Sequence, residues 1–389
     1  MPDTLRVLNS LTEPRVGGPH LRSLGVATEL REQGVETLFL LPDGSDEFEE
    51  LATDHGFEVL RPGLRRMHPP TNVLSNVRYL SQCIPGVRRI RTLIAEHDID
   101  VVHVGMTLNF QAAAAAHRSD TPLAWFFNDT GTPWPLRPIA AEMATRTADE
   151  IAVAADAVHE YFFSDSTQTR VIYPPVDTTE FDPAPVSTGD PSVRAKFDID
   201  PDVPLLCAVG NLNPAKGHEY LLEATAAVRD QYGEVAVLVA GKVLDTRREY
   251  FERLKRRRAE LGLDDTVNYL GRRSDIPRLL AAADLFVLSS VKEACPIAVL
   301  EAMAMERGVV ATRVGGTPEQ IVDGKHGWLV PPQNSATLAD AMTDALQSPD
   351  ERACRGRAAR KRVRDTFSLE RCAQNHLELY RATLNAHAD

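Results

Sequence analysis

Short apolar runs alternate with longer stretches of mixed polarity along most of the chain, a pattern typical of βαβ units with parallel sheets. The expected strands lie at 5–8, 38–41, 99–103 and 123–127 in the first half, and at 205–209, 235–239, 267–270, 285–288 and 308–312 in the second. A helix is expected at about 19–33, after the first strand. The alternation therefore predicts an α/β protein with two doubly wound domains.

A proline-rich stretch separates the two halves. Seven prolines occur from Pro174 to Pro204, around a Ser-Thr-Gly-Asp segment. A length of 389 residues also favours two domains. The expected boundaries are an N-terminal domain over 1–183, a linker over 184–203, a C-terminal domain over 204–365 and a final segment over 366–389.

Composition narrows the class of protein. The chain has 43 Lys plus Arg and 55 Asp plus Glu, and its net charge of −12 argues against a general nucleic-acid binder. No apolar run approaches the roughly 18 residues that span a bilayer, and the first residues do not resemble a signal peptide. Five scattered cysteines without a CxxC pair favour reduced thiols and give no metal site. A cytoplasmic location is therefore expected.

The strongest chemical signal follows the expected strand at 285–288. A short loop carries Glu293, and Pro296 is suited to open a helix. The free backbone N–H groups at the start of that helix could hold an anion such as a phosphate; they lie near Ala294, Cys295, Pro296 and Ile297. Glu301 lies about one turn into the helix, so both carboxylates can border one pocket and accept hydrogen bonds from hydroxyl groups. An ordinary pair of surface glutamates is the alternative.

Two glycine-containing loops follow strands and suggest phosphate binding. The loop after the strand at 205–209 delivers Lys216, a point charge well placed for a diphosphate, although it lacks the Gly-Lys-Ser/Thr of a P-loop. Gly17 and Gly18 follow the first strand and would let the backbone approach a phosphate closely. GxGxxG is absent, so an NAD-dependent dehydrogenase is the least expected class. Taken singly, an exposed lysine and ordinary turns explain these loops.

Together, the segments resemble the family 4 glycosyltransferases. The matching elements are Glu293-x7-Glu301 and the segments 17–18, 176–181, 209–217, 283–290, 314–319 and 328–332. The resemblance covers nearly the whole chain and is strongest from about 170 to 335. It implies the GT-B fold, with two Rossmann-like domains facing a central cleft, the acceptor at the first domain and a nucleotide-sugar at the second. It also implies a helix within 366–389 that returns to the first domain.

The resemblance implies roles on the donor side. Glu293 would contact the donor sugar, and Glu301 would hold the ribose hydroxyls. Lys216 would bind the diphosphate together with the amides near 294–297, and Gly18 would bring backbone close to the leaving phosphate. Lys216 and Glu293 are therefore the expected catalytic residues.

Several positions depart from the family pattern or are less specific. Arg272 and Arg273 fall where such enzymes hold the base, largely through backbone. Asn211 stands where the family usually has an arginine on the diphosphate, and Arg313 or Arg272 could supply the missing charge. Asn128 stands where the family commonly has a histidine. The expected acceptor-binding residues are His20, His103, Asn128 and Asp129.

The resemblance also implies a reaction. A hexose-type sugar would move from a nucleoside-diphosphate sugar to a hydroxyl of a small metabolite, a glycan or a lipid-linked acceptor. The anomeric configuration would be retained, and neither a cofactor nor a metal would be needed. Two alternatives stay open: a nucleotide-sugar-binding protein without transfer activity, suggested by Asn211 and Asn128, and an epimerase of the same fold.

One segment contrasts with the acidic average of the chain. Residues 59–95 contain no Asp, Glu or Lys but seven arginines, which are Arg61, Arg65, Arg66, Arg78, Arg88, Arg89 and Arg91. A solvated helix face is the simpler interpretation. The alternative is attraction to an acidic acceptor or to anionic lipid, with peripheral contact at the inner membrane face.

Overall fold

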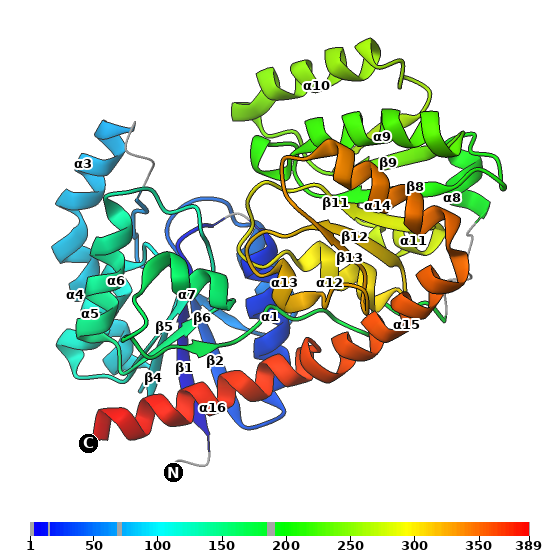
Figure 1. Ribbon diagram of the computed structural model, residues 1–389. Helices are drawn as coiled ribbons and strands as arrows, with labels where there is room; N and C mark the ends of the chain where they lie inside the picture. The colour runs from blue at the N-terminus through cyan, green and yellow to red at the C-terminus, as the bar shows by residue number, and fades with distance from the viewer. Residues whose placement is uncertain (1–3, 15, 68–71, 185–190, 389) are drawn as a thin grey trace. The chain divides into compact units, whose positions relative to one another are not determined.

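The computed structural model describes residues 4–14, 16–67, 72–184 and 191–388 (Figure 1). The chain divides into two compact units, one formed by Met1–Pro174 with Leu369–Asp389 and the other by Pro175–Ser368. Each unit contains one parallel β-sheet with helices packed on it. Among the described helices, none combines the length and the apolar character needed to cross a bilayer.

The first unit is built on a seven-stranded sheet in the order β3-β2-β1-β4-β5-β6-β7. Its strands are β1 (Leu5–Ser10), β2 (Val35–Leu40), β3 (Glu58–Leu60), β4 (Val101–Gly105), β5 (Leu123–Phe127), β6 (Glu150–Val153) and β7 (Arg170–Val171). All neighbouring strands pair in parallel, and the strand order reverses between β1 and β4. The loops that follow these two strands diverge there, which opens space for a ligand at the carboxyl edge.

The helices of the first unit are α1 (Gly18–Arg31), α2 (Glu47–Asp54), α3 (Val73–Ser81), α4 (Cys83–Glu96), α5 (Phe110–Ser119), α6 (Leu136–Thr147), α7 (Asp156–Phe162) and α16 (Leu369–Ala388). α1 packs with α16 on one face of the sheet, and α4 packs with α5 on the other (Figure 1). Right-handed crossovers on either side of the point of reversal require this arrangement. α16, red in Figure 1, thus belongs to the first unit although it ends the chain.

The second unit is built on a six-stranded parallel sheet in the order β10-β9-β8-β11-β12-β13. Its strands are β8 (Leu205–Val209), β9 (Ala236–Ala240), β10 (Val267–Gly271), β11 (Leu285–Leu288), β12 (Gly308–Thr312) and β13 (Trp328–Val330). The order reverses between β8 and β11, so the loops after these two strands border the expected ligand crevice of this sheet.

The helices of the second unit are α8 (Pro191–Lys196), α9 (His218–Tyr232), α10 (Arg248–Glu260), α11 (Ile276–Ala282), α12 (Ile297–Ala304), α13 (Thr317–Gln320), α14 (Ser335–Gln347) and α15 (Pro349–Thr366), with 3₁₀ turns at Pro214–Lys216 and Asp245–Arg247. α9 and α14 pack together on the sheet, and Leu221, Val228, Leu338 and Met342 are buried in the core they share. The central strands are buried along nearly their whole length, as expected for a parallel sheet covered on both faces.

The strands predicted from apolar runs all occur, and their ends differ from the predicted ones by at most three residues. The sequence pattern did not indicate β3, β6, β7 and β13 as strands. These four have two to four residues each and lie in the outer parts of the sheets. Such short segments carry too few alternating positions to stand out as strands.

The observed division of the chain differs from the expected boundaries. Residues 176–182, expected in the first domain, belong to the second unit: Val176 N donates to Phe367 O (2.9 Å), and the buried Arg360 donates to Asp182 Oδ1 (3.0 Å). Part of the expected linker is helical, because α8 packs on α11 and Arg194 pairs with Asp284 (2.8 Å). The rest of that linker includes 185–190, which lie outside the described residues.

Candidate active site

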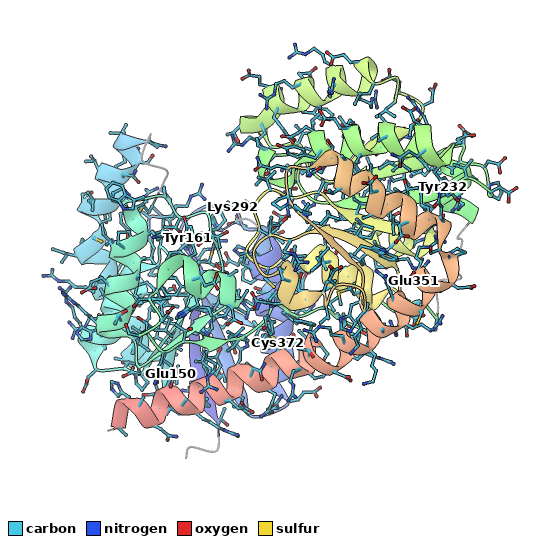
Figure 2. All side chains as sticks on the ribbon, viewed as in Figure 1. Glu150, Tyr161, Tyr232, Lys292, Glu351 and Cys372 are labelled. Atoms are coloured by element: carbon cyan, nitrogen blue, oxygen red, sulfur yellow. The ribbon has the colours of Figure 1, made fainter. Side chains whose placement is uncertain are left out.

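The loops that follow β8 and β11 are joined by hydrogen bonds at the carboxyl edge of the second sheet (Figure 2, where Lys292 marks the loop after β11). Val291 N donates to Ala215 O (2.8 Å), and Ser289 Oγ donates to Lys216 O (3.0 Å). Gly217 has φ +58°, and a Cβ there would lie 2.3 Å from Ser289 O. Only glycine allows the loops to approach this closely, and their approach brings Lys216 beside Glu293.

Lys216 and Glu293 form a partly buried ion pair. Lys216 Nζ lies 2.6 Å from Glu293 Oε1, and Ser290 Oγ donates to the same oxygen at 2.6 Å. Thr312 on β12 donates to Ser290 O (2.6 Å) and thereby fixes the loop from the neighbouring strand. The pair presents a cation and a carboxylate side by side at the reversal of strand order. This combination suits a ligand that carries both phosphate and hydroxyl groups.

A glycine loop supports the backbone of Glu293. Gly315 has φ +51°, and a Cβ there would lie 2.3 Å from Glu293 O. Gly316 N donates to Ala294 O (2.6 Å). The segment 314–319, which looks like ordinary turns when taken alone, therefore holds the loop that positions the carboxylate.

The start of α12 is held by a residue that the sequence did not single out. Gln320 Nε2 donates to Pro296 O (3.1 Å) and lies 3.2 Å from Cys295 Sγ. Pro296 caps the helix in extended conformation, so the first backbone N–H groups of α12 point out of the carboxyl edge of the sheet. The anion-binding amides expected near 294–297 are thus held in place from α13.

Glu301 lies on α12 in a half-buried position between two other ionisable groups. Burial, and then the charge of Glu180, raises its pKa to about 7. Burial, and then the charge of Asp177, also raises the pKa of Glu180. On β8, burial raises the pKa of Cys207 to about 12, with the charge of Glu301 as a second cause. Glu180 was present in the sequence only as part of the 176–181 motif; its proximity to Glu301 follows from the fold.

The other donor-side candidates have partners of their own. Asn211 is exposed, and its Oδ1 accepts a hydrogen bond from Lys242 N (3.2 Å), which connects the loops after β8 and β9. Arg273 forms a two-bond ion pair with Asp275 (2.8 and 2.5 Å) at the start of α11. Arg313 lies 3.3 Å from Asp323. Arg272 is exposed. None of these contacts places a second cation beside Lys216.

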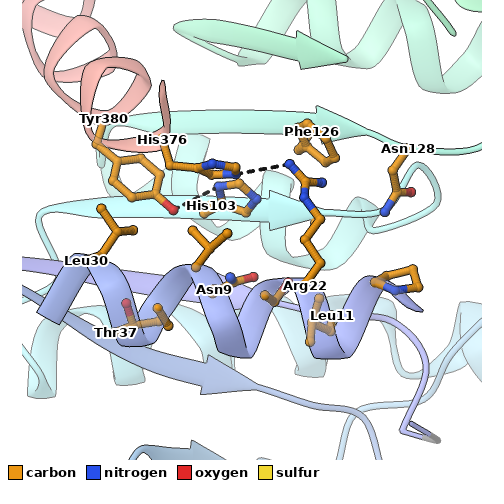
Figure 3. Close-up of a pocket in the computed structure, with 15 residues that line it drawn as sticks. Asn9, Leu11, Arg22, Leu30, Thr37, His103, Phe126, Asn128, His376 and Tyr380 are labelled. Carbon is orange, nitrogen blue, oxygen red and sulfur yellow. Dashed lines mark hydrogen bonds between the residues drawn. The ribbon is translucent and has the colours of Figure 1, made fainter. Parts of the chain in front are cut away.

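In the first unit, His103 belongs to a buried cluster rather than to an open site (Figure 3). Its Nδ1 lies 3.2 Å from the hydroxyl of Tyr380 on α16, and its ring stacks on Phe126. Arg22 lies over the ring of Phe126 and 3.3 Å from His376 Nε2. Burial lowers the pKa of His103 to about 3, so the imidazole is neutral at ordinary pH. His103 thus contributes to the packing of α16 on the sheet.

The remaining acceptor candidates are not brought together. His20 is buried against Phe48, and its Nε2 is hydrogen-bonded to Glu13 O. Asn128 lines the same narrow cavity as His103 (Figure 3), whereas Asp129 lines a different one. The structure therefore does not bring the four residues to one site: His103 and Asn128 share one cavity, and Asp129 and His20 lie apart from it.

Asp129 borders a cavity of about 530 Å³ at the carboxyl ends of β1, β4 and β5. Its carboxylate accepts hydrogen bonds from Thr107 Oγ1 (2.5 Å) and from the backbone N–H groups of Gly131 and Thr132 (both 2.8 Å). An ion pair between Arg66 and Glu13 forms part of the wall. Sequence reasoning did not identify Thr107, Thr132, Arg66 or Glu13 as lining residues. Within the described parts of the chain, no cluster of three or more His, Cys, Asp or Glu side chains is arranged to hold a metal ion.

Family models match both halves of the chain. "Glycosyltransferase Family 4" matches residues 16–180, and "Glycosyl transferases group 1" matches residues 190–362. A D-inositol 3-phosphate glycosyltransferase of Saccharomonospora viridis is 31% identical over 74% of this chain and 66% of its own. For the same enzyme of Corynebacterium urealyticum, the identity is 30% over 63% of this chain and 59% of the relative. The chain thus spans less than two thirds of the length of these two relatives.

A GDP-mannose-dependent alpha-(1-6)-phosphatidylinositol monomannoside mannosyltransferase of Mycolicibacterium smegmatis is 27% identical over 83% of this chain and 84% of its own. Among solved structures, a glycosyltransferase from Rickettsia africae has a TM-score of 0.82 at 20% identity and covers 98% of this chain and 99% of its own. HepE of Anabaena in complex with UDP-glucose has a TM-score of 0.80 at 23% identity and covers 96% and 98%.

The structural likenesses confirm the predicted fold class, with two Rossmann-like parallel-sheet units of the GT-B kind. The two family models together match nearly the whole chain, and their boundary lies within the proline-rich segment. The chain therefore belongs to the family 4 glycosyltransferases, with a group 1 glycosyltransferase domain as its second half.

Proposed function

We propose that the chain is a glycosyltransferase that moves a hexose-type sugar from a nucleoside-diphosphate sugar to a hydroxyl of an acceptor. The observation that carries this proposal is the Lys216–Glu293 ion pair, with Nζ and Oε1 2.6 Å apart at the reversal of strand order in the second sheet. Relatives whose names include GDP-mannose and a solved complex with UDP-glucose also support a nucleotide-sugar donor.

Each part of the donor has a matching group in this site. Lys216 and the first N–H groups of α12 supply positive charge for the diphosphate. Glu293 can accept hydrogen bonds from the sugar hydroxyls, and Glu301 can accept them from the ribose hydroxyls. Without a ligand, Glu293 neutralises Lys216, so an arriving diphosphate competes with this carboxylate for the ammonium group.

The chemistry follows from where charge develops. Cleavage of the bond between the anomeric carbon and the diphosphate oxygen gives an oxocarbenium-like sugar and a negatively charged leaving group. Lys216 and the α12 amides stabilise the departing charge, and they are held in place before the reaction by the loops after β8 and β11. We propose transfer without a divalent metal, because these groups supply the positive charge that the leaving diphosphate needs. Retention of configuration is proposed from membership of the family.

The proposal is tested by incubating the full chain with a panel of nucleotide-sugars and following release of free nucleoside diphosphate. Release that depends on Lys216 supports the assignment. Binding of nucleoside diphosphate without any release, or conversion of the donor sugar to an epimer without release, would instead favour one of the two alternative functions.

Nucleotide binding is expected to strengthen as pH rises through about 7. The ribose hydroxyls donate to ionised Glu301, whose pKa is raised to about 7 by burial and by the charge of Glu180. Below that pH, the proton on Glu301 must leave before the ribose is bound, so affinity should fall up to about tenfold per pH unit. Calorimetry with uridine and guanosine diphosphates between pH 5.5 and 8.5 measures the effect.

Two controls isolate Glu301 from the titration of the nucleotide itself. The 2′,3′-dideoxynucleoside diphosphate has the same titrating phosphates but no ribose hydroxyls. Its affinity should not show the pH dependence that comes from Glu301. The variant Glu301→Gln should lose that dependence for the ordinary nucleotide. An equal pH dependence for both nucleotides would remove Glu301 from the ribose site.

A further inference from the structure

Consecutive helices of the first unit expose a row of large apolar side chains. Leu74, Val77 and Leu80 on α3 and Ile84 on α4 are each between 55% and 66% exposed. The two helices are labelled α3 and α4 in Figure 1, and Gln82 lies between them in the sequence. The spacing of the four residues places them along one side of the helical surface. We call these four residues the apolar stripe. Monomeric proteins rarely expose a contiguous row of this kind without a partner.

The apolar stripe is not part of the core of the first unit. α3 and α4 are anchored instead by buried side chains, which are Tyr79, Val87, Ile90 and Ile94. α4 also packs closely on α5. Because the anchoring residues lie on other sides of these helices, polar substitutions in the apolar stripe should leave the fold intact.

The surroundings of the apolar stripe are strongly basic. Two of the seven arginines in 59–95 are neutralised from outside the segment, because Arg61 pairs with Asp46 and Glu49 (3.2 and 2.5 Å) and Arg66 pairs with Glu13. For the other five, the described residues provide no carboxylate within ion-pair distance. These exposed residues are Arg65, Arg78, Arg88, Arg89 and Arg91, here called the basic flank. The positive charge thus persists in the folded protein, although the whole chain carries −12.

We propose that the apolar stripe and the basic flank form a docking surface for an anionic lipid bilayer. Leucine and isoleucine side chains on an amphipathic helix enter the boundary between headgroups and acyl chains, while arginines beside them pair with lipid phosphates. The apolar stripe and the basic flank both lie within residues 65–91, and this segment contains no acidic residue.

Charge favours a bilayer over a second copy of the chain. In a symmetric dimer formed through the apolar stripe, the same surface of each copy would lie in the interface, and the two basic flanks would face each other. Repulsion between arginines with no carboxylate among them opposes that arrangement, whereas an anionic bilayer is attracted to all five.

Binding to vesicles tests the proposal directly. The full chain is mixed with phosphatidylcholine vesicles that contain either none or about one third phosphatidylserine, at about 0.1 M salt, and bound protein is measured by sedimentation. We expect binding to the anionic vesicles alone. Binding should weaken sharply at about 0.5 M salt, since the headgroup contacts are screened.

Substitution of the apolar stripe separates insertion from charge attraction. The triple variant Leu74→Ser, Leu80→Ser, Ile84→Ser should bind anionic vesicles at least about tenfold more weakly. The matched control is Tyr232→Ser with Val322→Ser, which removes exposed apolar side chains from the second unit (Tyr232 is labelled in Figure 2). The control should bind as the unsubstituted chain does, and both variants should keep its melting temperature and its affinity for nucleoside diphosphate.

Substitution of the basic flank tests the electrostatic part. Each arginine close to an anionic surface contributes about fivefold to binding, so Arg78→Ser with Arg88→Ser should lower it by roughly 25-fold. Arg256→Ser with Arg357→Ser, which removes two exposed arginines from the second unit, is the control of equal charge. The two double variants lose the same net charge, and they differ only in where the charge is removed.

Three results would overturn the proposal. The first is absence of binding to anionic vesicles at low salt. The second is an equal loss in the control variants, which would show a diffuse charge effect. The third is a dimer in analytical ultracentrifugation that the triple variant converts to a monomer, since the apolar stripe would then be an interface between copies.

Discussion

Replacement of Lys216 by alanine is expected to lower turnover of the nucleotide-sugar by about 10²–10³-fold, because one preorganised positive group beside the leaving diphosphate would be lost. Affinity for nucleoside diphosphate should fall as well, since the ammonium group would contact the phosphates in the ground state too. Turnover is measured as diphosphate release at saturating donor, and affinity is measured by calorimetry.

The fold should tolerate this change. Lys216 lies at the end of a 3₁₀ turn, and hydrogen bonds from Ser289 Oγ to Lys216 O and from Val291 N to Ala215 O would still join the loops after β8 and β11 when the ion pair with Glu293 is lost. Lys325→Ala is the matched control, because it removes an exposed lysine from another loop of the second unit. Turnover within about threefold of the unsubstituted chain in Lys216→Ala, at an unchanged melting temperature, would show that the diphosphate is bound elsewhere.

Glu293→Gln is expected to lower turnover, as Lys216→Ala does, but not to weaken the binding of nucleoside diphosphate. Loss of the carboxylate removes a contact to the donor sugar, so turnover should fall by about 10²-fold or more. Nucleoside diphosphate, which has no sugar at that position, should bind as tightly as before or more tightly. The reason is that Glu293 Oε1, 2.6 Å from Lys216 Nζ, would no longer compete with the phosphates for that ammonium group.

The comparison between nucleoside diphosphate and nucleotide-sugar makes this prediction specific. Glutamine keeps the size of the side chain and can still accept the hydrogen bond from Ser290, so the loop should keep its conformation. If Glu293→Gln weakened the binding of nucleoside diphosphate as much as that of the nucleotide-sugar, Glu293 would be a structural residue of the loop rather than a contact to the sugar.

The fold could be predicted from the sequence where strands are long and buried. The longer strands β1, β2, β4, β5, β8, β9, β11 and β12, and the edge strand β10, all contain an apolar run that is visible without the structure. The short outer strands are defined by pairing with a neighbour rather than by their own pattern. The domain boundary was displaced because prolines indicate breaks in regular structure but not which sheet the segment packs on. Contacts such as Arg360 with Asp182 decide that.

The candidate site could be predicted where the chain itself places residues at strand ends. Lys216 and Glu293 each follow a strand by a few residues, and the reversal of strand order brings those ends together. Side-chain direction could not be predicted in the same way. His103 ends the strand predicted at 99–103, as a site residue would, but in the structure it lies in the middle of β4 and its ring points into the core toward Tyr380 on the last helix. Glu180 approaches Glu301 only because 176–182 pack with the second unit.

Product analysis of the full chain with donor and candidate acceptors, by release of nucleoside diphosphate and by NMR of the sugar products, decides whether the chain transfers a sugar. We expect free nucleoside diphosphate and a new glycosidic bond of the same anomeric configuration as the donor, in amounts that fall together in Lys216→Ala. The proposed transferase function would be contradicted if the chain bound nucleoside diphosphate tightly but left every donor in the panel intact, as Lys216→Ala would.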